Sequence, residues 1–281
     1  MGKGTNYISK EPDEKGFRTY SAEENQIWAD LYARQAELLP SRACAEFLEC
    51  LQKLGLPHDR VPQLDEVTKT LKAATGWGVE GVPALISFKK FFKLLADKKF
   101  PAATFIRTRD EFDYIQEPDI FHEVFGHCPL LMNPVYANFM QKYGEMGLEV
   151  EKADRAMLAR LYWFTVEFGL MRSKGKGLSI YGAGIVSSVG ESQYALGGKP
   201  ELKEADLVTI FRTLYRIDIY QPIYFVIESF EQLYSLVERK EEVFAAIKEA
   251  KRLGPFTPKF DVSDLPSGDL RVKMAAPQKA S

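Results

Sequence analysis

The chain has 281 residues, of which 46% are hydrophobic and 27% are charged, and its formal net charge is −2 at pH 7. These values are typical of a globular protein with one large domain or two small ones, and they exclude a charge-driven nucleic-acid or acidic-membrane partner. The N-terminus has no apolar signal core, no apolar run is long enough to span a membrane, and the cysteines are few. We therefore expect a cytoplasmic protein.

Helical apolar spacing, bounded by Gly, Pro and capping residues, runs through most of the chain. The clearest start is Ser21, which forms a capping box with Glu24. Short strands are expected within 79–86, at 104–107 and at 270–274, and the helices are predicted at about 21–38, 42–54, 64–74, 88–98, 134–148, 155–171, 204–215, 222–236 and 240–252.

No domain boundary interrupts this series of helices. We expect a flexible N-terminal segment over residues 1–20 and a single domain over 21–255. The Pro- and Gly-rich residues 256–281 are predicted to form a tail that is partly ordered.

Two of the three histidines fall within residues 117–129, which read Glu-Pro-Asp-Ile-Phe-His-Glu-Val-Phe-Gly-His-Cys-Pro. Neutral imidazole is the commonest protein ligand for a metal, so His122 and His127 predict a metal site. Their spacing differs from the H-E-x-x-H of zinc proteases, and residues five apart on an α-helix point about 140° apart. We therefore expect the helix to end between them, at Gly126, with Pro129 preventing its continuation. Two ordinary histidines near a helix end are the simpler alternative.

A third ligand is predicted from residues 155–171, where Arg160 and Glu167 are the only charged side chains after position 155. A helix that is apolar nearly all round is buried, and a buried carboxylate is costly unless a cation or a metal neutralises it. The partner is either a buried Arg or Lys, or a metal shared with His122 and His127. Two histidines and a carboxylate bind Fe(II) in non-haem oxygenases and zinc in hydrolases. The absence of the H-E-x-x-H spacing and the aromatic surroundings favour iron.

Three long motifs resemble the signatures of the pterin-dependent aromatic amino acid hydroxylases. They occupy residues 117–130, 162–170 and 181–188, in the order found in that family, and shorter matches extend the resemblance over about 20–255. The resemblance implies a mostly α fold, with a single catalytic domain of many helices and a few short β-strands, and an iron site in a central cleft.

The resemblance also implies the chemistry. A non-haem Fe(II), held by His122, His127 and Glu167, would use O₂ and a tetrahydropterin to hydroxylate an aromatic amino acid. Two of the implied substrate-binding residues act on the carboxylate: Arg107 clamps it, and Asp119 orients Arg107. The others are Trp163 and Phe168 around the ring, and Gly184 and Ser187 against the amino acid. The implied pterin-binding residues are Phe91, which stacks on the ring, Glu123, which bonds through water, Tyr162, and the loop residues Ala84 and Ile86.

The sequence departs from the family in a few places. Ile115 replaces a Thr that mammalian members usually place near the amino acid, and the pterin loop at 82–86 lacks the usual Gly-Leu pattern. The chain has no room for the regulatory domain and tetramerisation helix of animal members, so we expect a monomer or small homo-oligomer.

Two positions bear on the choice of amino acid. Trp163 is typical of members that act on phenylalanine or tyrosine, and Ile217 stands where tyrosine hydroxylases carry Asp. An apolar wall leaves a phenol hydroxyl unpaired, so we expect L-phenylalanine as the substrate. A tryptophan or tyrosine hydroxylase, a zinc-dependent hydrolase with Glu123 as base, and a non-catalytic metal- or amino-acid-binding protein stay open as alternatives.

Overall fold

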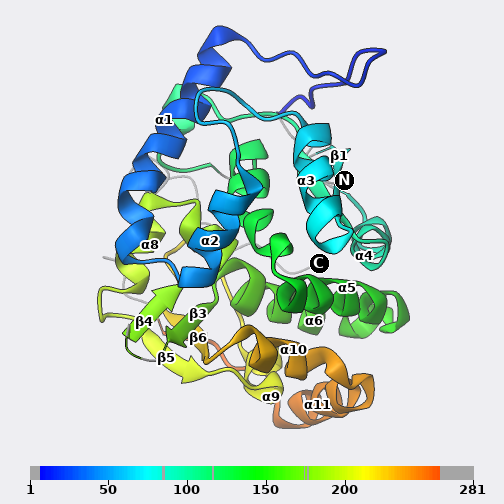
Figure 1. Ribbon diagram of the computed structural model, residues 1–281. Helices are drawn as coiled ribbons and strands as arrows, with labels where there is room; N and C mark the ends of the chain where they lie inside the picture. Colours follow the sequence, from blue (N-terminus) through cyan, green and yellow to red (C-terminus); the bar gives the residue numbers. More distant parts are fainter. Residues whose placement is uncertain (1–6, 84–85, 116, 174, 176, 260–281) are drawn as a thin grey trace.

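Helices make up most of the computed structural model, which describes residues 7–83, 86–115, 117–173, 175 and 177–259 (Figure 1). The α-helices are α1 (Ala22–Leu38), α2 (Ala45–Leu54), α3 (Leu64–Thr75), α4 (Phe88–Ala96), α5 (Pro134–Glu149), α6 (Arg155–Tyr162), α7 (Ala183–Val186), α8 (Val189–Ala195), α9 (Leu207–Arg212), α10 (Phe230–Glu238) and α11 (Lys240–Leu253). Within these residues, none of the helices combines the length and the apolar character that crossing a membrane requires.

The strands form two small sheets. In one, β1 (Gly78–Val82) pairs in parallel with β2 (Lys99–Ala103). The other has the order β4-β3-β6-β5. Its strands are β3 (Leu170–Ser173), β4 (Gly177–Ile180), β5 (Glu201–Glu204) and β6 (Ile223–Ile227), with β6 parallel to both of its neighbours. This mostly helical single domain with a few short strands confirms the predicted fold class.

Several predicted helix ends are confirmed, because local chemistry determines them. The Ser21–Glu24 capping box starts α1, and Gly76, with a φ of 81°, ends α3 in the left-handed conformation. The Asn133 side chain accepts hydrogen bonds from two backbone amides at the start of α5. From there α5 packs against α4 and α10 (Figure 1).

The predicted helix at 222–236 is wrong in its first half, which forms the strand β6. All five residues of β6 are buried between two parallel neighbours, so the sequence there is a continuous apolar run without alternation. Periodicity alone cannot distinguish such a run from a buried helix. The helix predicted at 204–215 is shorter than expected: it forms α9, and β5 lies just before it.

Other boundaries also move. The strand predicted at 104–107 lies earlier, at β2, and α8 was not predicted. The predicted strand at 270–274 lies outside the described residues. Residues 7–20, expected to be loose, are packed on the domain: the Tyr7 ring stacks on Phe105 with 4.4 Å between centroids, and Lys10 forms an ion pair of 2.7 Å with Glu24.

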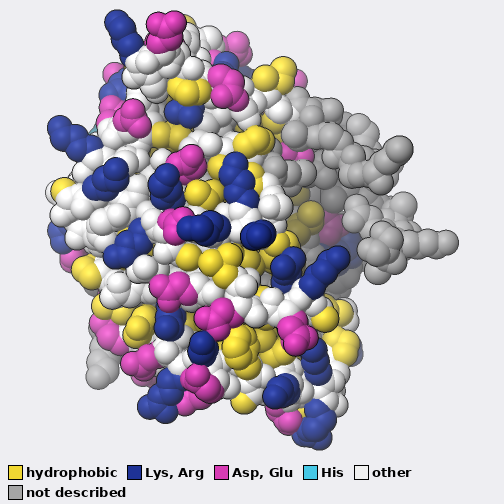
Figure 2. Space-filling model, turned by 90° about the vertical axis from the view of Figure 1, so that its right-hand side faces the viewer, with side chains coloured by type: hydrophobic (Ala, Val, Ile, Leu, Met, Phe, Trp, Pro, Cys, Tyr) yellow, Lys and Arg dark blue, Asp and Glu magenta, His cyan; other side chains and the backbone are white. Residues whose placement is uncertain are grey.

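The surface carries both signs of charge. On the face that Figure 2 shows, basic and acidic side chains are interspersed, in keeping with the net charge of −2. On this face the described side chains form no single-sign stripe of the kind that nucleic-acid binding proteins present.

Candidate active site

The two histidines lie on a π-helix, η3 (Phe121–His127), instead of at the end of an α-helix. A π-helix bonds each N–H to the carbonyl five residues back, so residues five apart lie nearly above one another. His122 and His127 therefore share one side, with 3.0 Å between their Nε2 atoms. The predicted helix end at Gly126 is wrong. This glycine lies against α7, where an added Cβ would be 3.1 Å from the Ala183 carbonyl oxygen.

Glu167 also lies on a π-helical turn, η6 (Trp163–Glu167), which follows α6 directly. The Thr165 hydroxyl donates to the Leu161 carbonyl at 2.5 Å, and the Phe168 amide bonds back to the Trp163 carbonyl. A side-chain donor that occupies a helix carbonyl favours such local widening. The predicted helix at 155–171 thus ends at Glu167, and the chain continues into β3.

The Glu167 carboxylate faces both imidazoles. Its Oε1 lies 3.2 Å from Nε2 of His127, and its Oε2 lies 3.4 Å from Nε2 of His122. Among the described residues, its ion-pair partners are these histidines and not the Arg or Lys of the alternative interpretation.

These separations fit a shared metal ion. Two atoms that each lie about 2.1 Å from one ion are about 3.0 Å apart at a right angle and about 3.4 Å apart at a tetrahedral angle. The three observed separations, 3.0, 3.2 and 3.4 Å, fall in this range. Glu123 is a more distant neighbour, with Oε2 3.9 Å from Nε2 of His127.

The hydrogen bonds of Ser187 fix the tautomer of His122. The Ser187 hydroxyl donates its proton to the Ala183 carbonyl at 2.7 Å, so it can only accept from Nδ1 of His122, 3.0 Å away. A proton on Nδ1 leaves the Nε2 lone pair directed toward His127 and Glu167. Metal-binding histidines are held by such partners as a rule.

The two carboxylates of the site have opposite pKa shifts. Burial acts to raise the pKa of Glu167, but attraction to His127 and His122 outweighs it and holds this pKa well below its usual range. Burial raises the pKa of Glu123 to about 8. Glu167 is therefore the carboxylate that offers a full negative charge beside the imidazoles.

Arg107 and Asp119 form a buried pair beside the histidines. Their side chains are 5% and 0% exposed. Arg107 donates from Nε and a terminal nitrogen to the two Asp119 oxygens at 2.8 and 2.9 Å. The backbone amides of Arg107 and His122 add bonds of 3.0 Å each. Burial opposes the charge on Asp119, but Arg107 outweighs this and keeps the pKa of Asp119 below its ordinary value.

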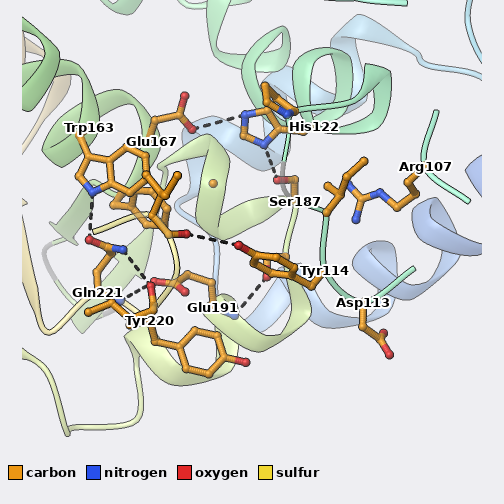
Figure 3. Close-up of a pocket in the computed structure, with 17 residues that line it drawn as sticks. Arg107, Asp113, Tyr114, His122, Trp163, Glu167, Ser187, Glu191, Tyr220 and Gln221 are labelled. Carbon is orange, nitrogen blue, oxygen red and sulfur yellow. Dashed lines mark hydrogen bonds and ion pairs between the residues drawn. The ribbon is translucent and has the colours of Figure 1, made fainter. Parts of the chain in front are cut away.

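Two cavities of about 320 Å³ each meet at His122 and Glu167. Figure 3 shows the first cavity, into which Arg107 and Trp163 both project. Its lining includes all of the predicted substrate-binding residues except Asp119, which supports Arg107 from behind: Arg107, Trp163, Phe168, Gly184 and Ser187. The second cavity is lined by the predicted pterin-binding residues Ile86, Phe91, Glu123 and Tyr162. Ala84 lies outside the described residues.

The glycines of the 181–188 motif allow close packing within the protein. A Cβ at Gly182 would lie 2.3 Å from the Glu167 carbonyl oxygen, so this glycine lets the two segments touch. A Cβ at Gly184 would similarly approach the Phe168 ring, at 2.9 Å. The motif thus packs the Glu167 segment in place.

Sequence reasoning missed Glu191 and Gln221, which are buried and line the first cavity. Ser188 and Glu191 match the pattern of a capping box, which predicts an exposed acidic side chain at a helix start. In the structure the Ser188 hydroxyl caps α8, but the Glu191 carboxylate turns inward and accepts from Tyr224 and from the Gln221 amide. No spacing in the sequence indicates that contact.

Known proteins resemble this chain over most of its length. The family model described as biopterin-dependent aromatic amino acid hydroxylase matches residues 8–264. The phenylalanine-4-hydroxylase of Pseudomonas aeruginosa is 50% identical over 258 residues, which are 92% of this chain and 97% of that protein.

Two solved structures extend the match. The apo structure of the cold-active phenylalanine hydroxylase from Colwellia psychrerythraea superposes with a TM-score of 0.88 at 51% identity, covering 92% of this chain and 100% of that one. The Chromobacterium violaceum phenylalanine hydroxylase with bound oxidized Fe(III) gives 0.82 at 44% identity, covering 88% and 90%. Neither a zinc hydrolase nor a non-catalytic binding protein finds support among these relatives. The chain belongs to the family of biopterin-dependent aromatic amino acid hydroxylases.

Proposed function

We propose that this protein is a phenylalanine 4-monooxygenase, which converts L-phenylalanine to L-tyrosine with O₂ and a tetrahydropterin. His122, His127 and Glu167 hold the Fe(II). The observation that carries the proposal is the meeting of two cavities at His122 and Glu167, two of these three side chains. One cavity is lined by a cation and aromatic rings, and the other is largely apolar. When bound, the iron and the tetrahydropterin supply the reductive activation of O₂, from which one oxygen atom enters the ring.

Arg107 binds the amino acid carboxylate. A guanidinium has five N–H donors, and Asp119 takes two of them, so donors remain for a carboxylate in the first cavity. The Phe112 carbonyl accepts only a long bond of 3.4 Å from one terminal nitrogen. Asp119 fixes the orientation of the guanidinium plane. Because the remaining donors lie in this plane, Asp119 also determines the direction from which the amino acid carboxylate binds.

Trp163 and Phe168 hold the substrate ring against the metal site. Their ring centroids are 4.5 Å apart, and Trp163 also stacks on Tyr215 at 4.3 Å with an interplanar angle of 13°. These stacked rings form a stiff wall for one face of the substrate. Glu167 follows Trp163 by four residues, so the substrate ring is held on the same side as the Glu167 carboxylate.

The second cavity takes the tetrahydropterin. Phe91 is packed edge-on against Tyr162, with 5.4 Å between ring centroids, and the Phe91 side chain lines the cavity as a surface for the pterin. Glu123 is the acidic residue in that lining beside Glu167, and it offers the pterin a polar contact.

Phenylalanine is favoured over tyrosine by apolar side chains in the first cavity. Ile217 and Ile219 line the first cavity, and the Ile219 side chain is buried. Ile217 is 56% exposed, so it lies at the mouth and contributes less to a buried wall than the sequence suggested. A phenol hydroxyl facing these side chains would lose its hydrogen bonds with water. The names of the relatives support the same substrate.

We also propose a cytoplasmic enzyme that acts as a monomer or small homo-oligomer. Cys44, Cys50 and Cys128 are all free thiols and buried, which suits a reducing compartment.

A product assay tests the proposal. The purified chain is supplied with Fe(II), tetrahydrobiopterin, ¹⁸O₂ and L-phenylalanine, and the products are identified by mass spectrometry. We expect L-tyrosine that carries one ¹⁸O atom, with slower turnover of L-tryptophan and L-tyrosine offered in parallel. A chain that binds iron but forms no tyrosine, or that prefers one of the other two amino acids, would contradict the assignment.

A further inference from the structure

Gln221 joins the two walls of the first cavity. Its Oε1 accepts a hydrogen bond of 2.9 Å from the indole Nε1 of Trp163. Its Nε2 donates to the backbone carbonyls of Arg216 and Ile219 at 3.0 Å each. Because two carbonyls face Nε2, the amide cannot be flipped, and Oε1 must point at the indole. Figure 3 shows Gln221 beneath Trp163 with this bond drawn.

The turn at 216–221 is therefore held by hydrogen bonds from the side chain of its own last residue, Gln221, to two of its backbone carbonyls. Ile217 and Ile219, which belong to this turn, line the cavity together with Trp163. One amide group thus fixes the position of the turn relative to the indole. Gln221 is 2% exposed, so water does not compete for these bonds.

Glu191 anchors the same residue from the other side. Its Oε1 accepts from the Gln221 backbone amide at 3.2 Å and from the Tyr224 hydroxyl. Both Glu191 and Tyr224 are buried. The Gln221 backbone is thereby tied to α8 and β6, and its side chain is left to hold the turn and the indole.

We propose that Gln221 is a positioning residue that determines which aromatic ring the enzyme accepts, acting through the indole of Trp163. The inference rests on the proposed function, since it assumes that the first cavity takes the amino acid. Without the bond to Gln221, the indole can rotate away from the turn, and the space between the walls widens. Larger rings then gain relative to phenylalanine.

The test compares selectivity in four chains: wild type, Gln221→Met, Trp163→Phe and the double variant. The measured quantity is the ratio of kcat/KM for L-phenylalanine to that for L-tryptophan. Loss of one ordinary hydrogen bond corresponds to a factor of about 2 to 10, and we expect Gln221→Met to lower the ratio by this factor. In the Trp163→Phe background the same substitution should lower the ratio by a clearly smaller factor, because the indole donor is already absent and only the bonds to the turn are lost.

A second readout does not depend on activity. The metal-free, ¹⁵N-labelled chain has three indole N–H signals, and Trp163→Phe identifies one of them. In Gln221→Met the Trp163 signal should shift and exchange faster with solvent. The Trp28 signal should stay in place, because that indole donates to the Pro57 carbonyl at 2.8 Å. Gln26→Met, on the exposed face of α1, is the matched control for both readouts.

Two further variants keep the test decisive. Gln221→Glu retains an oxygen for the indole but sets its second oxygen against the Arg216 and Ile219 carbonyls, so the turn is no longer held and the ratio should fall as it does in Gln221→Met. Gln221→Asn retains an amide that is too short to reach both the turn and the indole, and it replaces Gln221→Met if that variant does not fold.

An unchanged ratio and an unshifted Trp163 signal would overturn the inference, as would an equal loss of selectivity in the Trp163→Phe background. Failure of the wild type to hydroxylate either amino acid would instead overturn the proposed function, and the indole signals would still report on the Gln221 bond.

Discussion

Replacing Asp119 by Asn removes a charge from the interior without changing the size of the side chain. The two Asp119 oxygens accept four N–H groups, at 2.8, 2.9, 3.0 and 3.0 Å. An Asn side chain has one oxygen, and its NH₂ group would face donors instead of acceptors. The Arg107 guanidinium, 5% exposed, would also lose the charge that balances its own. Breaking a buried ion pair in this way costs about 3–5 kcal/mol.

Urea unfolding followed by circular dichroism measures this loss. Asp30→Asn is the matched control, because Asp30 pairs with Arg109 at 2.6 Å while both side chains are about 40% exposed. An exposed pair contributes about 0–1 kcal/mol to the free energy of unfolding, so the control should unfold almost as the wild type does. Asp119→Asn should also raise the KM for L-phenylalanine, since Arg107 is no longer held. Equal losses of stability in the two variants would refute the account of the buried pair.

Three further predictions concern the site and its surroundings. Ser187→Ala removes the acceptor for Nδ1 of His122 and should weaken Fe(II) binding about 10- to 100-fold by competition with a chelator; unchanged affinity would count against the tautomer argument. Arg107→Ala should chiefly raise the KM for L-phenylalanine, and an unaltered KM in steady-state assays would remove the carboxylate role. Burial raises the pKa of Glu191 from 4.5 to about 7, so the folded chain holds the carboxyl proton more tightly than the unfolded chain. The free energy of unfolding should therefore be highest below about pH 4.5 and should fall by about 3 kcal/mol as the pH rises through about 7. Glu191→Gln should flatten this part of the stability profile in urea titrations from pH 5 to 8, and a profile parallel to that of the wild type would exclude the effect.

The sequence was informative where chemistry is local. The Ser21 and Asn133 caps and the glycine after α3 depend on neighbouring residues, so their positions could be read directly. The same holds for the composition of the site: two histidines and one carboxylate in apolar surroundings indicated a metal before any geometry was known.

The geometry of that site could not be read in the same way. With the 3.6-residue period of an α-helix, the spacing of His122 and His127 predicts a helix that ends between them. The π-helix places both histidines on one side without ending between them, and the contact of Gly126 with α7 is a tertiary contact that the spacing does not reveal. Glu191 and Gln221 were missed for a related reason, since their role depends on partners far along the chain.

The most direct test of the central claim is an Fe(II) titration of the metal-free chain, read as the initial rate of L-tyrosine formation from L-phenylalanine with tetrahydrobiopterin and O₂ in excess. A single site formed by His122, His127 and Glu167 predicts that the rate rises linearly and reaches its plateau at one Fe(II) per chain, and that Glu167→Ala shows no rise. A plateau at another ratio, or a Glu167→Ala chain that reaches the wild-type rate at one equivalent, would contradict it.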